Sequence, residues 1–356
     1  MYVSRKALIC SRNKNETLEH SLIVKLKAQT VFSSDQHWLY PLFELEDYLK
    51  QSDTIASDLF LSDKIAGKAA ACLIVFLGIK KCHIELLSER AIPVFEANGI
   101  TFTYDHLVDH IQCRTEDLIT DKMSISDAYL FLRKRAGRVQ GLSVKLENVS
   151  VRIDEKLVID HLHLDLGRGE QLIIHGANGA GKTTLLRTML GFIPIAEGTI
   201  KIGDYLVGSD LWKQNRSIIG YVHQENINNN FPISSGEVVQ IGLGKSRISK
   251  SETEYRIEVA MRRTGSFHLF KQPYHTLSGG EKQRVSLARC LCQNARVFLL
   301  DEPTSFLDQQ GKEDLLILLS ELSLNEAPSM ILVSHDLQWI EQLKWPRKEL
   351  KGGRLC

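Results

Sequence analysis

The sequence predicts an α/β fold divided into two domains, and three observations lead to this expectation. In the second half, apolar segments of strand length alternate with amphipathic helical segments, the pattern of a largely parallel sheet. A glycine-rich loop joins one of these strands to the helix after it. A polar seam with two glycines, residues 133–143, separates the halves. We therefore expect a small α/β domain over 1–136, a linker over 137–142 and a larger domain over 143–356.

Composition excludes several classes of protein. Hydrophobic residues make up 43% and charged residues 24%, and the net charge of +1 gives no reason to expect a nucleic-acid partner. The seven cysteines lack C-x-x-C spacing, which favours free thiols in a reducing compartment over a zinc site. The longest apolar run, 69–79, would span about 17 Å as a helix, against about 30 Å for a bilayer core. We expect it to be a buried core element.

The first domain has fewer elements, and local patterns predict each. Residues 21–34 are typical of a β-hairpin. Residues 62–79 predict a helix that Ser62 or Asp63 caps and that runs into the apolar core. Residues 80–100 predict a strand and then a helix, and 124–135 predict an amphipathic helix that leads to the seam.

The second domain should begin with a strand at 144–153. Further apolar segments predict buried strands, each followed by a helical pattern. The expected strand and helix pairs are 170–176 with 181–192, 295–303 with 311–322, and 329–335 with 336–343, before a last strand at 349–356.

The loop that joins the strand 170–176 to the helix 181–192 has the chemistry of a phosphate site. Residues 176–183 fit G-x-x-x-x-G-K-[ST], with a strand before and a helix after. Backbone N–H groups of such a loop and the positive end of the helix attract anions. We expect Lys182 to reach the β- and γ-phosphates, Thr183 to bind Mg²⁺ and Thr184 to lie near the α-phosphate. The remaining loop residues are Gly176, Ala177, Asn178, Gly179, Ala180 and Gly181.

Two acids at the end of the strand 295–303 supply a partner for this loop. Because parallel strands end at one edge of a sheet, Asp301 should lie beside the loop and hold Mg²⁺, through water. Glu302 is then placed to polarise an attacking water. The alternative is a surface acid pair that only ends a strand.

A second glycine-rich helix start, "LSGGE" at 277–281, narrows the class. Together with the other motifs of this region, it makes residues 143–356 closely resemble the ATP-binding cassette (ABC) ATPase family. Those motifs are the loop 176–183, Gln224 in "GYVHQEN", the acids in "LLDEP", "SFLD" at 305–308 and His335 in "VSHD". The resemblance implies a P-loop cassette with a RecA-like core and a helical subdomain. It also implies a head-to-tail dimer that binds ATP and Mg²⁺.

The resemblance also assigns roles. ATP on one P-loop would be closed over by Ser278, Gly279 and Gly280 of the other subunit, and Asp308 belongs to the D-loop. Glu302 would be the general base, and His335 would contact the γ-phosphate. Gln224 would sense Mg²⁺ and the attacking water. Ile153 stands where the family usually stacks an aromatic residue on adenine, so we expect weaker ATP affinity or relaxed base choice.

The segment after Gln224 indicates which partner protein this ATPase would drive. "FPISSGEVV" at 231–239 resembles the same stretch in ATPase subunits of zinc and manganese importers. This resemblance predicts an importer subunit that docks on separate membrane permeases, hence a cytoplasmic protein peripheral to the inner face of the cell membrane. The alternatives are a helix that merely packs inside its subdomain, or a non-transport ABC ATPase of translation or repair with a ligand-sensing first domain.

The first domain resembles a little-characterised family marked by A-D-K-x-x-G-K-A-A-A, which has a cytidine-deaminase-like α/β fold. "SDKIAGKAAA" at 62–71 carries the resemblance, and "DKMS" at 121–124 departs from the family's C-P-M-E. Zinc deamination needs H-x-E followed by P-C-x-x-C, and only "HIE" at 83–85 is present. Lys64 and Lys68 lie four residues apart near a predicted helix start. They are either a solvated face or an anion site that regulates the motor.

Overall fold

A computed structural model of the chain describes residues 20–111, 114–223, 232–244, 248–325 and 327–356. The chain divides into two units, Met1–Arg138 and Val139–Cys356. The division falls inside the segment 137–142, part of which is bound within the second unit. There the carbonyl of Gln140 accepts from Arg296 Nε and that of Leu142 from Ser329 Oγ.

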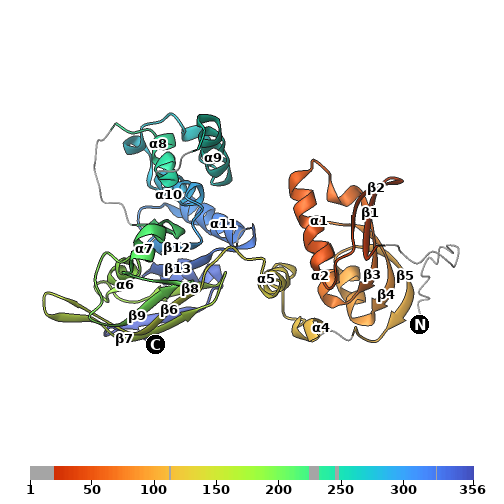
Figure 1. The fold of residues 1–356 in the computed structure, drawn as a ribbon, viewed down its shortest axis with the longest axis horizontal. Helices are drawn as coiled ribbons and strands as arrows, with labels where there is room; N and C mark the ends of the chain where they lie inside the picture. Colours follow the sequence, from red (N-terminus) through yellow and green to blue (C-terminus); the bar gives the residue numbers. More distant parts are fainter. Residues whose placement is uncertain (1–19, 112–113, 224–231, 245–247, 326) are drawn as a thin grey trace. The chain divides into compact units, whose positions relative to one another are not determined.

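The first unit is built on a five-stranded mixed sheet in the order β2-β1-β3-β4-β5. β1 is antiparallel to β2 and β3, whereas β3, β4 and β5 run parallel. Figure 1 shows α1 and α2 against this sheet, and α5 packs on α2. The bounds are β1 Leu22–Leu26, β2 Gln29–Ser34, α1 Tyr40–Gln51, β3 Leu59–Ala66, α2 Lys68–Phe76, β4 Lys81–Ser88, α3 Ile92–Ala97, β5 Thr101–Val108, α4 Arg114–Leu118 and α5 Ile125–Arg135.

One prediction about this unit is wrong. Ser62 and Asp63 do not cap a helix, because they lie in β3, the strand paired between β1 and β4. Helix α2 begins only at Lys68, with Gly67 as its N-cap. The alternation of Leu59 and Leu61, both fully buried, shows why this segment extends. The apolar run that follows is a buried helix, as predicted.

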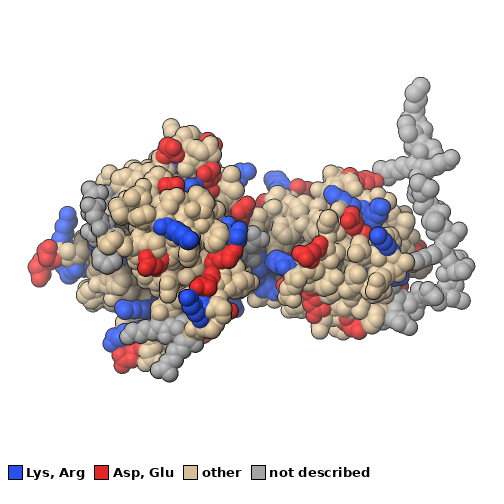
Figure 2. All heavy atoms as spheres, turned by 90° about the horizontal axis from the view of Figure 1, so that it is seen from above, with Lys and Arg blue, Asp and Glu red and all other residues tan. Residues whose placement is uncertain are grey.

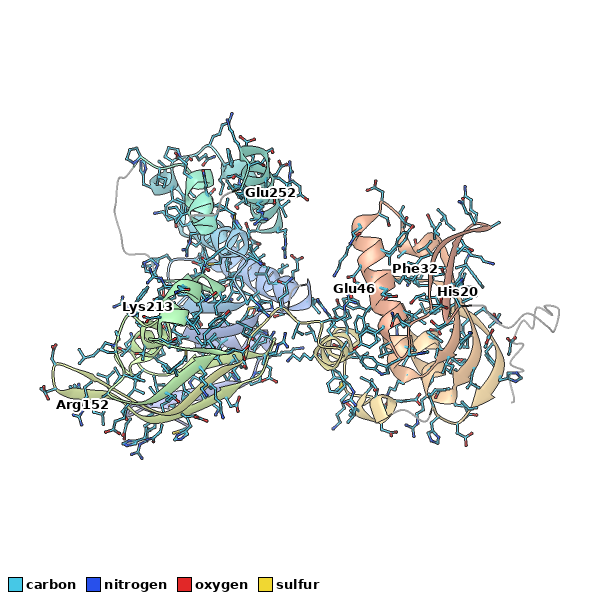
Figure 3. The ribbon with its side chains drawn as sticks, in the orientation of Figure 1. His20, Phe32, Glu46, Arg152, Lys213 and Glu252 are labelled. Carbon is cyan, nitrogen blue, oxygen red and sulfur yellow. The ribbon has the colours of Figure 1, made fainter. Side chains whose placement is uncertain are left out.

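A polar contact ties α1 to α5 inside the first unit. Glu46, labelled on α1 in Figure 3, is 5% exposed and accepts a hydrogen bond from the Tyr129 hydroxyl at 2.5 Å. The ring of Tyr129 stacks on Phe76 of α2 at 3.6 Å between centroids. Burial and the adjacent carboxylate raise the pKa of Tyr129, so the hydroxyl remains the donor.

The second unit contains two sheets. One is six-stranded in the order β11-β12-β13-β8-β14-β15, parallel except for the terminal hairpin β14–β15, and the other is antiparallel in the order β10-β9-β6-β7. The single last strand of the prediction is therefore a hairpin. The strands are β6 Val144–Ile153, β7 Lys156–Leu166, β8 Gln171–His175, β9 Glu197–Ile202, β10 Tyr205–Leu206, β11 Ile219–Val222, β12 Val297–Asp301, β13 Ser329–Ser334, β14 Arg347–Lys351 and β15 Arg354–Leu355.

Helices cover the larger sheet and form a separate lobe with its own core. They are α6 Lys182–Met189, α7 Asp210–Asn215, α8 Ser235–Gln240, α9 Lys250–Arg263, α10 Gly279–Cys292, α11 Gln309–Asn325 and α12 Leu337–Ile340. Leu172 and Ile174 of β8 face a core shared with α6 and the antiparallel sheet. Ile173, between them, faces the core under α11 and α12, so β8 is buried on both faces. Helices α8, α9 and α10 share a third cluster, around Val239, Met261 and Val285.

The surface is of mixed charge. On the face drawn in Figure 2, basic and acidic side chains are interspersed over both units. None of the helices in the described parts of the chain combines the length and the apolar character of a membrane span.

The cysteines of the described residues are free thiols. Cys72, Cys82, Cys290 and Cys292 are buried and Cys356 is exposed. Burial raises the pKa of Cys72 to about 11.

Candidate nucleotide site

Register within the six-stranded sheet brings three sequence motifs to one edge. β12, β13 and β8 are parallel neighbours, with Asp301 opposite Val333 and Ser334 opposite His175. The loop after β8 is the glycine-rich segment 176–181. β12 ends at Asp301, which Glu302 follows, and β13 leads into His335. Segments that lie about 120 and 150 residues apart in the chain therefore meet at the carboxyl ends of adjacent strands.

The glycine-rich loop leads directly into α6. Gly181, the N-cap, has a φ of +100°, in the left-handed region that glycine tolerates. A Cβ on Gly181 would also lie 3.1 Å from Val158 Cγ1. Lys182 is 6% exposed, and its Nζ donates to the carbonyls of Gly176 at 2.8 Å and Ala177 at 3.2 Å. The ammonium is thus held over the loop whose N–H groups form the expected anion site.

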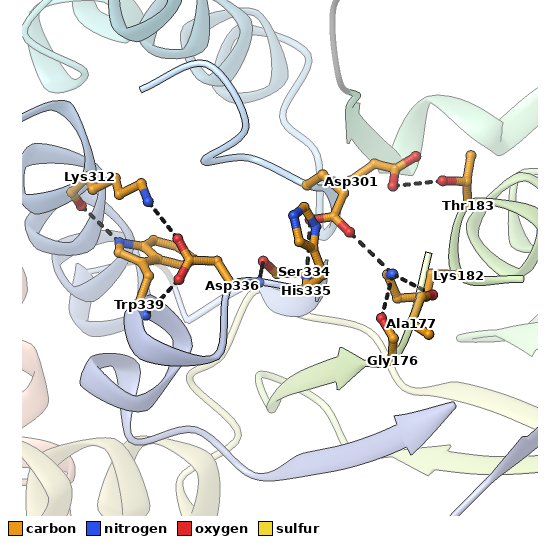
Figure 4. A network of polar contacts seen from close by, with 11 residues as sticks. Gly176, Ala177, Lys182, Thr183, Asp301, Lys312, Ser334, His335, Asp336 and Trp339 are labelled. Carbon is orange, nitrogen blue, oxygen red and sulfur yellow. Dashed lines mark hydrogen bonds and ion pairs between the residues drawn. The ribbon is translucent and has the colours of Figure 1, made fainter. Parts of the chain in front are cut away.

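The Asp301 carboxylate lies beside the loop and accepts hydrogen bonds from two hydroxyl groups. The Thr183 hydroxyl donates to Asp301 Oδ1 at 3.0 Å, as Figure 4 shows. The Tyr221 hydroxyl donates to Asp301 Oδ2 at 2.8 Å, and burial together with the Asp301 charge raises the pKa of Tyr221. The sequence did not single out Tyr221. Tyr221 reaches Asp301 because β11 lies next to β12 in the sheet, and no sequence spacing indicates this contact.

Glu302 connects the loop to His335. It is 8% exposed, its φ of +47° turns the chain sharply at the end of β12, and its Oε1 lies 3.3 Å from Lys182 Nζ. Glu302 Oε2 accepts from the His335 backbone N–H at 3.1 Å and lies 2.8 Å from His335 Nδ1. The His335 side chain is half exposed. A buried carboxylate and a histidine are therefore held together next to the Lys182 ammonium.

These groups line a pocket of about 680 Å³. One set of lining residues belongs to the glycine-rich loop and the neighbouring sheet edge: Asn178, Gly179, Gly181, Lys182, Thr183, Thr184, Glu302 and His335. A second set, Ile153, Asp154, Lys156 and Val158, comes from the hairpin β6–β7, near whose tip Figure 3 labels Arg152. Ile153 is 38% exposed, so the hairpin offers the pocket an apolar side chain with a free face.

The remaining predicted site residues lie apart from this pocket or outside the described residues. Ser278 is exposed and caps α10, with its hydroxyl bonded to Glu281, and neither it nor Gly279 or Gly280 lines the pocket of its own chain. Asp308 accepts from the Gly311 N–H at the start of α11. Gln224 lies outside the described residues.

Neither interpretation of Lys64 and Lys68, a solvated helix face or an anion site, fits the structure. Lys64 lies in β3 and Lys68 in α2, so they do not share a helix face. The buried Glu116 carboxylate occupies the start of α2, where it accepts from the N–H groups of Lys68 at 2.9 Å and Ile111 at 2.7 Å. Lys68 Nζ pairs with Asp121. This carboxylate satisfies the helix start that an anion would need.

The "HIE" segment lies in β4, not at a helix start. His83 Nδ1 lies 2.9 Å from Thr103 Oγ1, and Nε2 lies 3.3 Å from Asp105 Oδ2. Across the described residues, no group of three or more His, Cys, Asp or Glu side chains is arranged to hold a metal ion.

The fold and the site together define a P-loop nucleotide-binding protein. Two family models match the chain. The ABC transporter model matches residues 159–305, and the model of a domain of unknown function (DUF1893) matches residues 12–129.

Curated proteins of metal transport are similar to more than half of the chain. The manganese transport system ATP-binding protein MntB of Bacillus subtilis is 37% identical over 203 residues, which cover 56% of this chain and 79% of that protein. The zinc import ATP-binding protein ZnuC of Vibrio vulnificus is 34% identical over 198 residues, 55% of this chain and 69% of that protein.

Two solved structures share the fold. CbiO1 from Clostridium perfringens, part of an ABC transporter complex, has a TM-score of 0.56 and 29% identity, and the match covers 61% of this chain and 87% of that one. The dimeric ATP-binding cassette MJ0796 bound to ADP and phosphate has a TM-score of 0.53 and 27% identity, with 60% and 96% covered. The chain belongs to the ABC transporter ATP-binding family, and it is an ATPase.

Proposed function

We propose that the chain is the subunit that energises import of a metal ion through an ABC transporter, acting as a head-to-tail dimer on separate permease subunits. The observation that carries this proposal is the pocket that joins the glycine-rich loop, Glu302 and His335 at one sheet edge. The manganese and zinc assignments of the two relatives support metal as the cargo.

At the phosphate end, Lys182 and the loop N–H groups bind the β- and γ-phosphates. Lys182 Nζ lies 3.3 Å from Glu302 Oε1. When ATP binds, Nζ leaves this carboxylate and contacts a phosphate oxygen instead. The freed carboxylate is left with His335, and it acts as the general base that takes a proton from the attacking water. His335 would orient the γ-phosphate, and Gln224, which lies outside the described residues, would sense the attacking water and Mg²⁺.

The residues beside the loop fit Mg²⁺. Thr183 and Asp301 offer a hydroxyl and a carboxylate 3.0 Å apart, and hard oxygen ligands of this kind suit the ion, which keeps several waters and phosphate oxygens of its own. When bound, the ion would neutralise charge on the phosphates. Tyr221 fixes the orientation of the Asp301 carboxylate.

Dimerisation completes the site in this proposal. Ser278, Gly279 and Gly280 lie away from the pocket of their own chain, and the exposed start of α10 offers a second group of N–H donors. In a head-to-tail pair this helix start closes over the ATP held by the other subunit, and Asp308 lies in the loop that meets the partner.

A second cavity, of about 640 Å³, offers a place for the permease. Phe192 and Arg216 from the core line one side, and Val238, Ile241 and Tyr274 from the helical lobe line the other. Phe192 is 62% and Ile241 59% exposed, so the cavity has an apolar rim that a permease helix would cover. Docking there would hold the ATPase peripheral to the inner face of the cell membrane.

The segment used to predict metal import also has a folding role. Ser234 and Glu237 form a capping box at the start of α8, where Ser234 also lowers the pKa of Glu237. Part of "ISSGE" therefore specifies a helix start. The exposed residues of the cavity rim are better candidates for partner choice.

For the first unit we propose a cytidine-deaminase-like fold that has lost zinc chemistry. The mixed sheet with β1 antiparallel to β3 supports the fold, and the placement of His83 in a strand removes the ligand geometry. The unit would then regulate the motor or bind a partner.

The test is capture of the permease. A tagged Glu302→Gln chain, which should bind ATP and hydrolyse it slowly, is expressed in its native cell, crosslinked and purified from membrane and soluble fractions. A multi-span permease in the membrane fraction is expected. Ribosomal or DNA-repair partners in the soluble fraction would instead support the non-transport ABC ATPase.

A further inference from the structure

Lys312 of α11 makes two polar contacts with the segment that follows His335. Lys312 Nζ donates to Asp336 Oδ2 at 2.5 Å. The carbonyl of the same residue accepts from Trp339 Nε1 at 3.0 Å, and both contacts are drawn in Figure 4. One lysine thus holds the chain at two points just after His335.

Asp336 passes this restraint to the backbone beside His335. Its Oδ1 accepts from the Trp339 N–H at 3.2 Å and so caps α12. Its own N–H donates to Ser334 Oγ at 3.1 Å. The Lys312 ammonium lowers the pKa of Asp336, which keeps the carboxylate charged. Because the His335 side chain is half exposed, few packing contacts fix it, and its position depends on this backbone and on Glu302.

Lys312 is also bound to the loop 305–308. Its backbone N–H donates to the Asp308 carbonyl at 3.0 Å, and Asp308 Oδ1 accepts from the Gly311 N–H at 2.8 Å. Phe306 in this loop is 54% exposed. A displacement of the loop therefore moves the first turn of α11, and Lys312 with it.

We propose that Lys312 is a positioning residue for ATP hydrolysis, which holds His335 against Glu302 through Asp336 and relays the position of the loop 305–308 to that pair. The inference rests on the proposed function, because it requires His335 and Glu302 to act on the γ-phosphate and the water.

A purely structural role for Lys312 can be separated from this one. Trp339 is 3% exposed and packs in the apolar cluster that contains Leu315 and Leu319 of α11. That packing holds α12 on α11 without the ammonium. Lys312→Met keeps the stem and the backbone carbonyl and removes only the charge, whereas Lys312→Arg retains a donor for Asp336.

The experiment measures kcat, KM for ATP and the thermal midpoint of the purified full-length chain and its variants. Lys312→Met should lower kcat by about 10-fold or more, because a small misplacement of a reacting group is costly. KM and the midpoint should stay near their wild-type values, and Lys312→Arg should recover most of the rate. Lys213→Met is the matched control, since Lys213 (Figure 3) pairs with Asp210 on the surface of α7 and is 67% exposed. It should leave kcat unchanged.

The double variant Lys312→Met with His335→Ala tests whether Lys312 acts on kcat through His335 or independently of it. If Lys312 acts through His335, the double variant is no slower than His335→Ala alone. Wild-type kcat in Lys312→Met overturns the inference. So does an additive loss in the double variant, or a loss of kcat that follows a lowered thermal midpoint. Full turnover in His335→Ala would refute the proposed roles of the site itself. Loss in His335→Ala without loss in Lys312→Met would refute only the role of Lys312.

Discussion

Gly279, the first residue of α10, lies directly against the backbone of the loop 305–308. A Cβ built on Gly279 would lie 2.3 Å from the Phe306 carbonyl oxygen and 3.1 Å from its carbon. An ordinary contact begins near 3.4 Å, so Gly279→Ala must push the two segments apart by about 1 Å. Overpacking of this kind costs about 1–3 kcal/mol, whereas the helix propensity gained by replacing glycine, about 1 kcal/mol, is common to Gly279→Ala and Gly280→Ala.

The assay compares Gly279→Ala with Gly280→Ala. At Gly280 the nearest atom to a built Cβ is Leu307 Cδ2 at 3.7 Å, an ordinary contact. The thermal midpoint of Gly279→Ala should lie about 2–12 °C below that of Gly280→Ala for a domain of this size. The turnover of Gly279→Ala should fall by about 100-fold because the loop before α11 is displaced. ATP binding to the single chain should persist, since Gly279 does not line its pocket. Equal thermal midpoints for the two variants would refute this steric argument.

Three further changes test other parts of the molecule. Glu302→Gln should bind ATP but lower kcat by about 10²–10⁴-fold, the usual contribution of a general base, and an unchanged kcat would exclude that role. Ile153→Tyr should strengthen ATP binding by about 1–3 kcal/mol through base stacking and increase preference for ATP over GTP in a competition assay. A strong ATP preference with micromolar affinity in the wild type would contradict the expected weakness. Glu116→Ala should destabilise the first unit by about 1–3 kcal/mol and speed amide exchange at Lys68 and Ile111, whose N–H groups lose their acceptor. Unchanged exchange would contradict that anchoring role.

Local patterns were sufficient where a motif and its flanking elements agreed. The strand before the glycine-rich loop, the helix after it, and the strands that end in Asp301 and before His335 were all predicted at nearly their observed positions. The strands are short runs of mainly apolar residues and the helix carries an apolar face, each next to chemically specific residues, so local propensity and tertiary burial favour the same structure.

The errors arose where distant partners decide the structure. Ser62 and Asp63 before an alanine-rich run imitate a helix cap, but pairing with β1 and β4 extends the segment. The contact of Tyr221 with Asp301 depends on the parallel register of β11 and β12, across 80 residues of chain. The pairing of Lys312 with Asp336 likewise needs α11 and α12 to be packed first. No sequence spacing encodes these contacts.

The central claim, that this ATPase energises metal import, is tested most directly by uptake in the native cell. The initial rates of radioactive manganese, zinc and iron uptake are measured after the chromosomal copy is changed to Glu302→Gln, with the variant protein present at the wild-type level. The account predicts that uptake of at least one of these metals falls to the level seen when the whole chain is deleted. Unchanged uptake of all three, with the variant confirmed inactive in vitro, would contradict it.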